Sequence, residues 1–307
     1  MQLKEMVATS DNIVFFGGAG VSTESGIPDF RSVDGLYHQK FRYPPETILS
    51  HTFYERHKEE FFDFYRQKLI APKARPNAAH VKLAQWERDG KLKAVITQNI
   101  DGLHQMAGSH EVLELHGSVL RNYCERCGKF YGVDAILHST GVPKCSCGGD
   151  IKPDVVLYEE SLDMQMMEHA LEYISRADML IIGGTSLVVY PAAGLVQYYR
   201  GHKLVVINKG EVGAGVRADL TIRAPIGEVL SQLLQLLQLL QRRRRRHGEG
   251  GCSYNIMLSA SQQRKNKAVG ECQEENWRVM QKQQRATLPE GCLRAWETRY
   301  DHRRSNK

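Results

Sequence analysis

The chain has 307 residues, of which 42% are hydrophobic, 25% charged and 8% aromatic. This composition is typical of a globular protein and excludes a collagen-like, mucin-like or wholly disordered chain. The formal net charge of +6 is unevenly distributed: residues 1–240 carry 25 Lys and Arg against 28 Asp and Glu, whereas residues 241–307 carry 16 against 7. Any affinity for nucleic acid is therefore expected in the basic tail.

The sequence contains no apolar run of 18 residues, so no membrane-spanning helix and no membrane partner are expected. Its first residues, MQLKEM, lack the apolar segment of a secretory signal peptide. Together these observations predict a cytoplasmic protein, which we expect to be a monomer.

Short apolar runs alternate with helical patterns through the first 210 residues. The runs are typical of strands buried on both faces and comprise Asn12–Phe16, Lys93–Thr97, Val112–Leu115, Met179–Ile182 and Lys203–Ile207. Helical patterns cover Asn77–Arg88, Asp163–Ser175 and Ala192–Tyr199. This alternation predicts an α/β fold with a doubly wound parallel sheet.

Two stretches interrupt the alternation and predict a smaller inserted domain. Residues 31–75 contain an aromatic-rich helix predicted over Phe53–Leu69, and residues 119–152 contain four cysteines. The large domain then consists of about 1–30, 76–118 and 153–240, and ligands commonly bind in the cleft between two such domains.

The end of the chain has a different character. A repeated Gln-Leu-Leu segment, Ser231–Gln241, is expected to end the last helix of the 1–240 unit. The run Arg242–Arg246 then opens a tail over 241–307 that is expected to be disordered. Such a run is most often solvated, and it is the one place where non-specific contact with nucleic acid is expected.

A glycine loop, Gly17–Ser22, follows the first predicted strand. Gly18 and Gly20 would let the backbone approach a pyrophosphate closely, and a following helix would point its amides at the phosphate. The pattern is not a full G-x-G-x-x-G, because Thr23 stands at the last position, and an ordinary turn remains an alternative. The acid, aromatic and basic residues that follow, Asp29, Phe30 and Arg31, suggest a lid that closes over a cofactor.

Four cysteines, Cys124, Cys127, Cys145 and Cys147, form two closely spaced pairs separated by 17 residues. This spacing can place four thiolates tetrahedrally around one Zn²⁺, and a closed four-cysteine site is structural rather than catalytic. The alternatives are unligated buried cysteines or a redox pair.

Polar residues gather after two of the predicted strands, at the sheet edge that faces the ligand in open α/β folds. Gln98, Asn99 and Asp101 follow one strand, and His116 follows the next. An N-cap role for Asn99 or Asp101 is the alternative to a functional one. His116 is the candidate for proton transfer near neutral pH. A second small-residue loop, Gly183–Ser186, and Asn208 follow two further strands.

With these motifs the sequence resembles the sirtuins, which are NAD-dependent protein deacylases. The resemblance is strongest to the bacterial members of the family. The resemblance spans roughly residues 5–235 and excludes residues 241–307. The matching pieces occur in the family's order: Gly18-Ala19-Gly20-Val21-Ser22, Gly26-Ile27-Pro28-Asp29-Phe30-Arg31, Gln98-Asn99-Ile100-Asp101, His116-Gly117, the four cysteines, Lys152–Glu159, Gly184-Thr185-Ser186-Leu187 and Ile207-Asn208.

The resemblance implies a Rossmann-like large domain, a small domain with a zinc module, and one structural Zn²⁺. It implies that NAD is a consumed co-substrate in the deacetylation of acetyl-lysine proteins or peptides, with nicotinamide and O-acetyl-ADP-ribose as products. His116 would be the general base, and Asn99 and Asp101 would act at the nicotinamide. The implied NAD contacts are Gly18, Ala19, Gly20, Thr23, Asp29, Phe30, Arg31, Gln98, Asn99, Ile100, Asp101, Gly184, Thr185, Ser186, Asn208 and Ile226.

The resemblance also implies where the peptide binds. The segment Val155-Val156-Leu157-Tyr158 would pair with the peptide as an added strand, with Leu187, Val188 and Tyr190 on its other side. Family members that prefer succinyl groups carry a Tyr-x-x-Arg pair, at whose positions this chain has Phe62 and Tyr65. This difference favours acetyl over acidic acyl groups. Tyr158-Glu159 replaces the more common Phe-Gly.

Three other functions would use parts of the same sequence. A mono-ADP-ribosyltransferase on the same scaffold is expected to lack the general base, yet His116 is present. A non-catalytic NAD- or ADP-ribose-binding module is expected to lack Asn99, Asp101 or His116, and none of the three is missing here. A zinc-ribbon nucleic-acid binder needs basic residues around the cysteines, but Cys124–Lys152 contains only four Lys or Arg.

Overall fold

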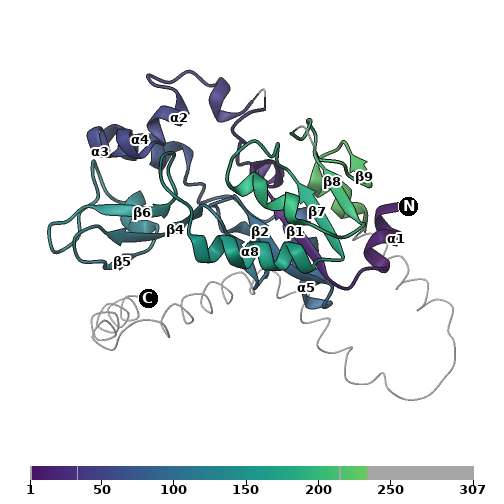
Figure 1. Ribbon diagram of the computed structural model, residues 1–307. Coiled ribbons are helices and arrows are strands. Elements are labelled where there is room, and N and C mark those ends of the chain that lie inside the picture. Colours follow the sequence, from purple (N-terminus) through teal and green to yellow (C-terminus); the bar gives the residue numbers. More distant parts are fainter. Residues whose placement is uncertain (1, 33, 214–215, 234–307) are drawn as a thin grey trace, which may run out of the picture. The chain divides into compact units, whose positions relative to one another are not determined.

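A computed structural model describes residues 2–32, 34–213 and 216–233. Its larger sheet is six-stranded and parallel, in the order β3-β2-β1-β7-β8-β9 (Figure 1). Its strands are β1 (Ile13–Gly17), β2 (Leu92–Thr97), β3 (Val112–Glu114), β7 (Met179–Gly183), β8 (Leu204–Ile207) and β9 (Leu220–Ile222). The five predicted strands are confirmed. β9 was not predicted, because its three residues include an exposed Thr221 between two half-buried residues and form no apolar run.

Alternate residues of β1 show why its sequence is apolar throughout. Ile13 and Phe15 pack in the core cluster on one face, and Val14 and Phe16 pack in the cluster on the other. The first cluster is covered by α1 (Gln2–Ala8), α5 (Ala78–Arg88) and the helical residues 226–233. The second is covered by α8 (Met164–Arg176) and η4 (Ala192–Tyr198). The sheet is therefore doubly wound.

The predicted helix starts follow capping chemistry. Asn77 caps α5 by accepting from the Ala79 amide at 2.9 Å, and its own amide donates to His80 Nδ1 at 3.2 Å. Asp163 caps α8 by accepting from the amides of Gln165 and Met166, at 2.8 and 3.1 Å. The segment predicted as a helix over Ala192–Tyr199 is a 3₁₀ helix, η4.

The second sheet is antiparallel, in the order β5-β4-β6, and belongs to the smaller layer at one end of Figure 1. Its strands are β4 (Gly117–Cys124), β5 (Phe130–Tyr131) and β6 (Ile151–Val155). Short helices accompany the two sheets: η3 (Leu36–His38), α2 (Pro45–Ile48), α3 (His51–Arg56), α4 (Lys58–Lys68), α6 (Leu103–Met106) and α7 (Asp134–Leu137).

The helix predicted over Phe53–Leu69 is in fact two helices. His57 leaves the helical region, with φ −136° and ψ 49°, and separates α3 from α4. The aromatic residues of both helices form the centre of a third core cluster, where Phe53, Phe61, Phe64 and Tyr65 are buried. The zinc-module residues Cys124 and Cys145 border the same core.

Ion pairs join the layers. Arg121 on β4 contacts Glu114 on β3 at 2.6 Å and Asp154 on β6 at 2.7 Å, so one guanidinium connects the edge of the large sheet to the small sheet. Lys58 on α4 contacts Glu125 and Asp150, at 3.1 and 2.9 Å, and so connects the helical part to the zinc module.

Among the described residues, no helix is long and apolar enough to cross a membrane. The predicted tail over 241–307 and its Arg242–Arg246 run lie outside the described residues.

Candidate active site and zinc centre

The two glycine loops meet between β1 and β7, where the strand order of the large sheet reverses. The Gly20 amide donates to the Gly184 carbonyl at 2.8 Å, and the Gly18 amide donates to the Gly183 carbonyl at 3.2 Å. A Cβ on Gly20 would lie only 2.8 Å from the Gly184 oxygen, which explains why glycine is needed at that position. The result is a narrow backbone crossing at the carboxyl edge of the sheet.

The first glycine loop differs from the predicted strand–loop–helix in one respect. It continues into two 3₁₀ turns, η1 (Ala19–Val21) and η2 (Thr23–Ser25), rather than a helix. Two short turns do not sum to a helix dipole, and the Gly18 and Gly20 amides are already used between the loops. Any phosphate held here must therefore rely on other donors.

A buried hydrogen-bonded cluster joins the first loop to the end of β2. Ser22 Oγ donates to Asp101 Oδ2 at 2.6 Å, and Asn99 Nδ2 donates to Ser22 Oγ at 3.0 Å. The Leu103 amide donates to the other Asp101 oxygen at 2.9 Å. Burial raises the pKa of Asp101, although these bonds to Ser22 and Leu103 oppose the shift.

His116 lies beside this cluster, on the turn between β3 and β4. Its Nδ1 is 3.0 Å from the Gln98 carbonyl oxygen, which can only accept, so Nδ1 carries the proton and Nε2 has a lone pair. Burial lowers the pKa of His116, so the ring is neutral at pH 7. The Gln98 side chain donates to Thr185 Oγ1 at 3.2 Å and connects this position to the second glycine loop.

The predicted lid residues lie on the segment that follows Gly26, whose φ of 82° turns the chain. The Asp29 carboxylate accepts from the amides of Arg31 and Ser32 at 3.0 and 2.7 Å. The Phe30 ring packs edge-on against Tyr37 at 5.6 Å, and the Arg31 guanidinium lies 5.3 Å from the same ring. Asp29 therefore orders the turn, and the Tyr37 ring contacts both Phe30 and Arg31.

The predicted peptide segment runs from the end of β6. The Val156 amide donates to the His116 carbonyl, and the Tyr158 amide donates to the Leu49 carbonyl. Leu157 is buried, whereas Tyr158 is 38% exposed. In the opposite segment Leu187 is buried, and Val188 and Tyr190 are 48% and 68% exposed.

Two of the implied NAD contacts lie toward β8 and β9. Asn208 follows β8 and its amide donates to the Ile222 carbonyl at 3.1 Å. Ile226 is 2% exposed and packs beneath Gly183, so its side chain belongs to the core. Contact between Ile226 and adenine stays a prediction.

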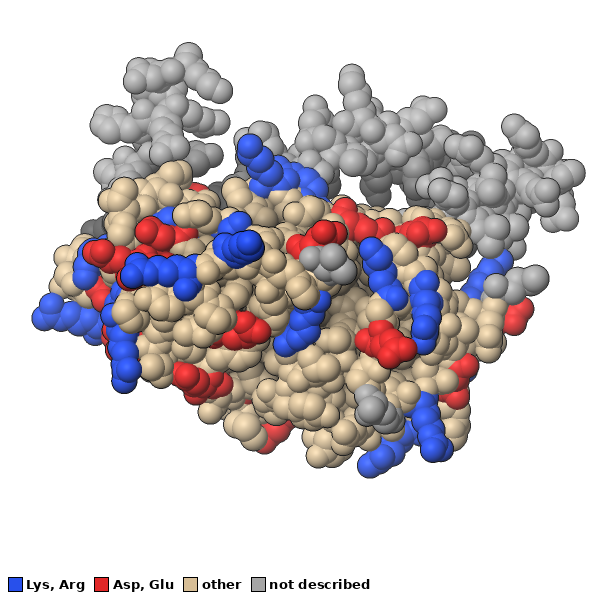
Figure 2. All heavy atoms as spheres, turned by 90° about the horizontal axis from the view of Figure 1, so that it is seen from above, with Lys and Arg blue, Asp and Glu red and all other residues tan. Residues whose placement is uncertain are grey.

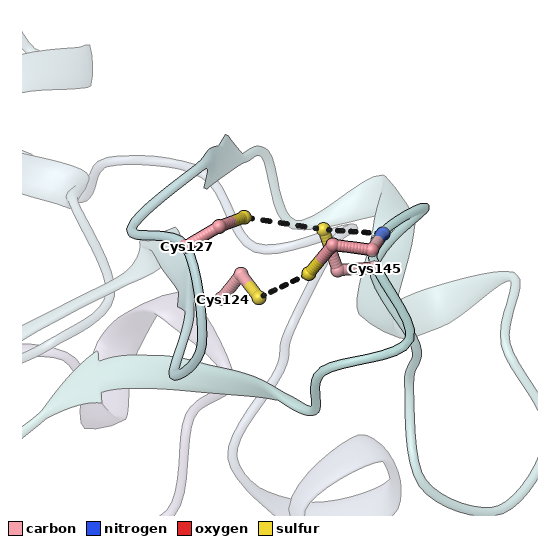
Figure 3. A group of neighbouring side chains, drawn as sticks. Cys124, Cys127 and Cys145 are labelled. Atoms are coloured by element: carbon pink, nitrogen blue, oxygen red, sulfur yellow. Dashed lines mark hydrogen bonds between the residues drawn. The ribbon is translucent and has the colours of Figure 1, made fainter.

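The four predicted cysteines converge, and their sulfur atoms all lie within 4.8 Å of one another (Figure 3). The Cys124–Cys147 and Cys127–Cys145 sulfur pairs are 3.4 and 3.6 Å apart, near the roughly 3.8 Å edge of a tetrahedral ZnS₄ site. The amides of Arg126 and Cys147 donate to Cys124 and Cys145. The donor set and its geometry fit Zn²⁺.

The sequence analysis missed three residues that the structure places in these networks. Ser22 was quoted only as part of a motif, although a polar residue in the turn after a buried strand is a signal for such a role. Tyr37 follows Leu36 in the inserted stretch 31–75 and lies in no periodic pattern. Arg121 pairs with Glu114 and Asp154, 7 and 33 positions away on two other strands, so its partners are defined only by the fold.

The chain combines a parallel sheet of the dinucleotide-binding type with two crossing glycine loops and a cluster of four cysteines. Comparison with known protein families shows which class of protein has this combination. The Sir2 family model matches residues 18–191, more than half of the chain. The chain belongs to the Sir2 family.

The most similar relatives include two clostridial proteins, each named NAD-dependent protein deacetylase. The protein of Clostridium perfringens is 62% identical over 237 residues, which cover 76% of this chain and 97% of the relative. That of Clostridium acetobutylicum is 59% identical over the same shares.

Solved structures of Sir2 proteins are also similar to this chain. A Sir2 H116A variant with a deacetylated p53 peptide and 3'-O-acetyl ADP-ribose has a TM-score of 0.70 and 40% identity, covering 76% of this chain and 97% of that one. A Sir2 complex with a p53 peptide and NAD⁺ has a TM-score of 0.69 and 40% identity, covering 78% and 98%.

Proposed function

We propose that the chain is an NAD-dependent protein-lysine deacetylase. The acetyl oxygen of acetyl-lysine displaces nicotinamide from the ribose carbon of NAD, and a ribose hydroxyl then attacks the carbon of the resulting imidate. Addition of water releases the free lysine and O-acetyl-ADP-ribose. NAD is thus consumed as a substrate, and the acetyl group ends on its ADP-ribose part.

The observation that carries this proposal is the state of His116. A general base must be neutral and must have a lone pair facing the reaction. The Gln98 carbonyl fixes the proton on Nδ1, and burial keeps the ring neutral at pH 7. Nε2 is therefore the atom that takes the proton from the ribose hydroxyl.

We assign the nicotinamide to the Ser22–Asn99–Asp101 cluster. Loss of nicotinamide develops positive charge on the ribose, so a fixed carboxylate in a water-poor pocket stabilises the transition state. Ser22 anchors Asn99 and Asp101 on the same hydroxyl, which fixes their geometry before NAD binds. Ile100 and Gln98 complete this wall, and Phe30 shields the reactive ribose from water.

The remaining NAD contacts follow the crevice between β1 and β7. Ala19, Thr23, Thr185 and Ser186 are assigned to the phosphates and the adjoining ribose, and Gly18, Gly20 and Gly184 provide the close backbone approach. Asp29 and Arg31 order the segment above, and Asn208 and Ile226 are assigned to the adenosine end.

The peptide is assigned to the groove between Val155–Tyr158 and Leu187–Tyr190. The amides of Val156, Leu157 and Tyr158 already donate to His116, Glu160 and Leu49. Among the described residues, no donor reaches the Val156 carbonyl, so we assign that oxygen to the acetyl-lysine amide. Backbone pairing of this kind tolerates many peptide sequences.

We assign acetyl, rather than an acidic acyl chain, as the group that the enzyme removes, on the evidence of two small-domain residues. Phe62 and Tyr65 are fully buried, and neither provides a cation for an acidic acyl chain. The Arg66 guanidinium, 5.5 Å from the centre of the Phe62 ring, donates instead to the Ile136 carbonyl and Ser139 Oγ. Succinyl groups should therefore be poor substrates.

The zinc site is assigned a structural role, because four thiolates leave no open coordination position. Four thiols that stay reduced suit the cytoplasm, and we propose that location. We also propose a monomer without a specific nucleic-acid partner. Figure 2 shows Lys and Arg intermixed with Asp and Glu over the face it presents, not gathered in one basic surface.

The decisive measurement is nicotinamide release from NAD, with and without an acetyl-lysine peptide, followed by mass spectrometry of the peptide. Release that depends on the peptide and equals the loss of acetyl groups is expected. Transfer of ADP-ribose to protein without deacetylation would instead establish a transferase, and no release from folded, zinc-loaded protein would indicate a binding module.

A further inference from the structure

Two tyrosine hydroxyls meet between the lid segment and the peptide segment. Tyr37, on η3, and Tyr158, three residues after the end of β6, form a hydroxyl–hydroxyl hydrogen bond across 121 positions of sequence. Burial and the Tyr158 hydroxyl both raise the pKa of Tyr37, so its hydroxyl is protonated at neutral pH and available for this bond. None of the roles assigned above uses this contact.

Tyr37 is held tightly by the lid segment. Its amide donates to the Phe30 carbonyl at 2.9 Å, and the Leu36 amide donates to the Asp29 carbonyl at 2.8 Å. Its ring packs against Phe30 and lies beneath the Arg31 guanidinium. A displacement of Tyr37 must therefore displace Phe30, the residue assigned to cover the reactive ribose.

Tyr158 is joined to the peptide side through its backbone. Its amide and carbonyl pair with Leu49 and His51, both at 2.9 Å. Two residues earlier, the Val156 amide bonds to the carbonyl of His116. A peptide that pairs with this segment therefore acts on a strand that contacts both His116 and, through Tyr158, the lid.

We infer that the Tyr37–Tyr158 pair is a positioning device that couples peptide binding to closure of Phe30 over the nicotinamide ribose. The inference rests on the proposed function. Peptide pairing fixes the segment that carries Tyr158, and the hydroxyl bond transmits that order to Tyr37 and the lid. Each ligand then binds more tightly in the presence of the other, because one ordering serves both sites.

The test measures this coupling directly in the full chain. Calorimetry gives the affinity of a carbocyclic, non-hydrolysable NAD analogue with and without a saturating acetyl-lysine peptide. The peptide is expected to raise that affinity in the native protein. Loss of one hydrogen bond should reduce the enhancement by roughly threefold to tenfold in Tyr37→Phe and in Tyr158→Phe.

The double variant and a control make the result specific. Tyr37→Phe combined with Tyr158→Phe should lose no more coupling than either single change, since both remove the same bond. Tyr123, on β4, is 40% exposed as a residue, close to the 38% of Tyr158, and Tyr123→Phe should keep the native enhancement. Affinity for the analogue without peptide should stay within twofold of the native value in Tyr123→Phe.

The outcomes separate this inference from the proposed function. An enhancement that is absent in the native protein, unchanged in both single variants, or reduced additively in the double variant overturns the positioning role. Peptide-dependent nicotinamide release by the same native sample, measured in parallel, shows whether the deacetylase proposal holds independently of the coupling.

Discussion

At the scale of single residues, the chemistry depends on which proton each group holds. His116 is needed for the second step, where the ribose hydroxyl loses its proton, but not for displacement of nicotinamide. We therefore expect His116→Ala to lower deacetylation by about 10²–10⁴-fold, the usual contribution of a general base. The same variant should keep exchange of labelled nicotinamide into NAD in the presence of peptide. Equal loss of exchange and deacetylation would contradict this division of roles.

The pH dependence follows from the same residue. Burial lowers the pKa of His116 below its ordinary 6.5, and only the neutral ring is a base. Activity should thus be fully present above pH 6.5 and fall as the pH decreases through the lowered pKa. Initial rates at saturating NAD and peptide, with circular dichroism at each pH to verify folding, check this. A rise of activity on acidification from pH 7 would refute it.

At the scale of elements, Arg121 shows how two sheets with little shared core are joined. Its partner Glu114 is 8% exposed, and burial raises the pKa of that carboxyl while Arg121 opposes the shift. Arg121→Met removes the cation and leaves Glu114 buried without its partner, which costs about 3 kcal/mol or more. We expect a clearly lower melting temperature, whereas Arg121→Lys should recover part of the loss. Unchanged unfolding of Arg121→Met in urea would show that the sheets are joined by other contacts.

Elements with a strong local signal could be predicted, and those that depend on tertiary partners could not. The apolar run of β1 and the helix starts at Asn77 and Asp163 are local, so the sequence was sufficient to place them. The break at His57 and the 3₁₀ form of the glycine loop depend on packing of the surrounding chain. For the same reason His116 and the cysteines could be proposed from sequence, but the Ser22 hydroxyl and the Tyr37–Tyr158 contact could not.

At the scale of the whole molecule, a pair of buried histidines sets the response to acid. His80 and His104 lie with ring centroids 4.7 Å apart beneath the large sheet, and Phe15 lies 6.1 Å from His104. Within the described part of the chain, both ring nitrogens of His104 and Nε2 of His80 have no hydrogen-bond partner. Burial lowers the pKa of His80 to about 4, and burial together with His80 lowers that of His104.

These lowered pKa values make stability depend on pH. Between pH 6.5 and about 4 the unfolded chain binds protons that the folded protein does not, so the free energy of unfolding falls as the pH decreases through this window. At about 1.4 kcal/mol per pKa unit, His80 alone contributes about 3 kcal/mol that is present above pH 6.5 and lost near pH 4.

Urea unfolding at several pH values between 7 and 4.5 tests this for the native protein and for His104→Leu. The leucine places an apolar group where two unpaired nitrogens lay, so stability at pH 7 should change little or increase. The decrease in unfolding free energy on acidification should be smaller in the variant. Zinc thiolates also take up protons in acid, but they are common to both proteins, so the difference between the two slopes belongs to the histidines. Parallel slopes would show that His104 does not contribute to the loss of stability in acid.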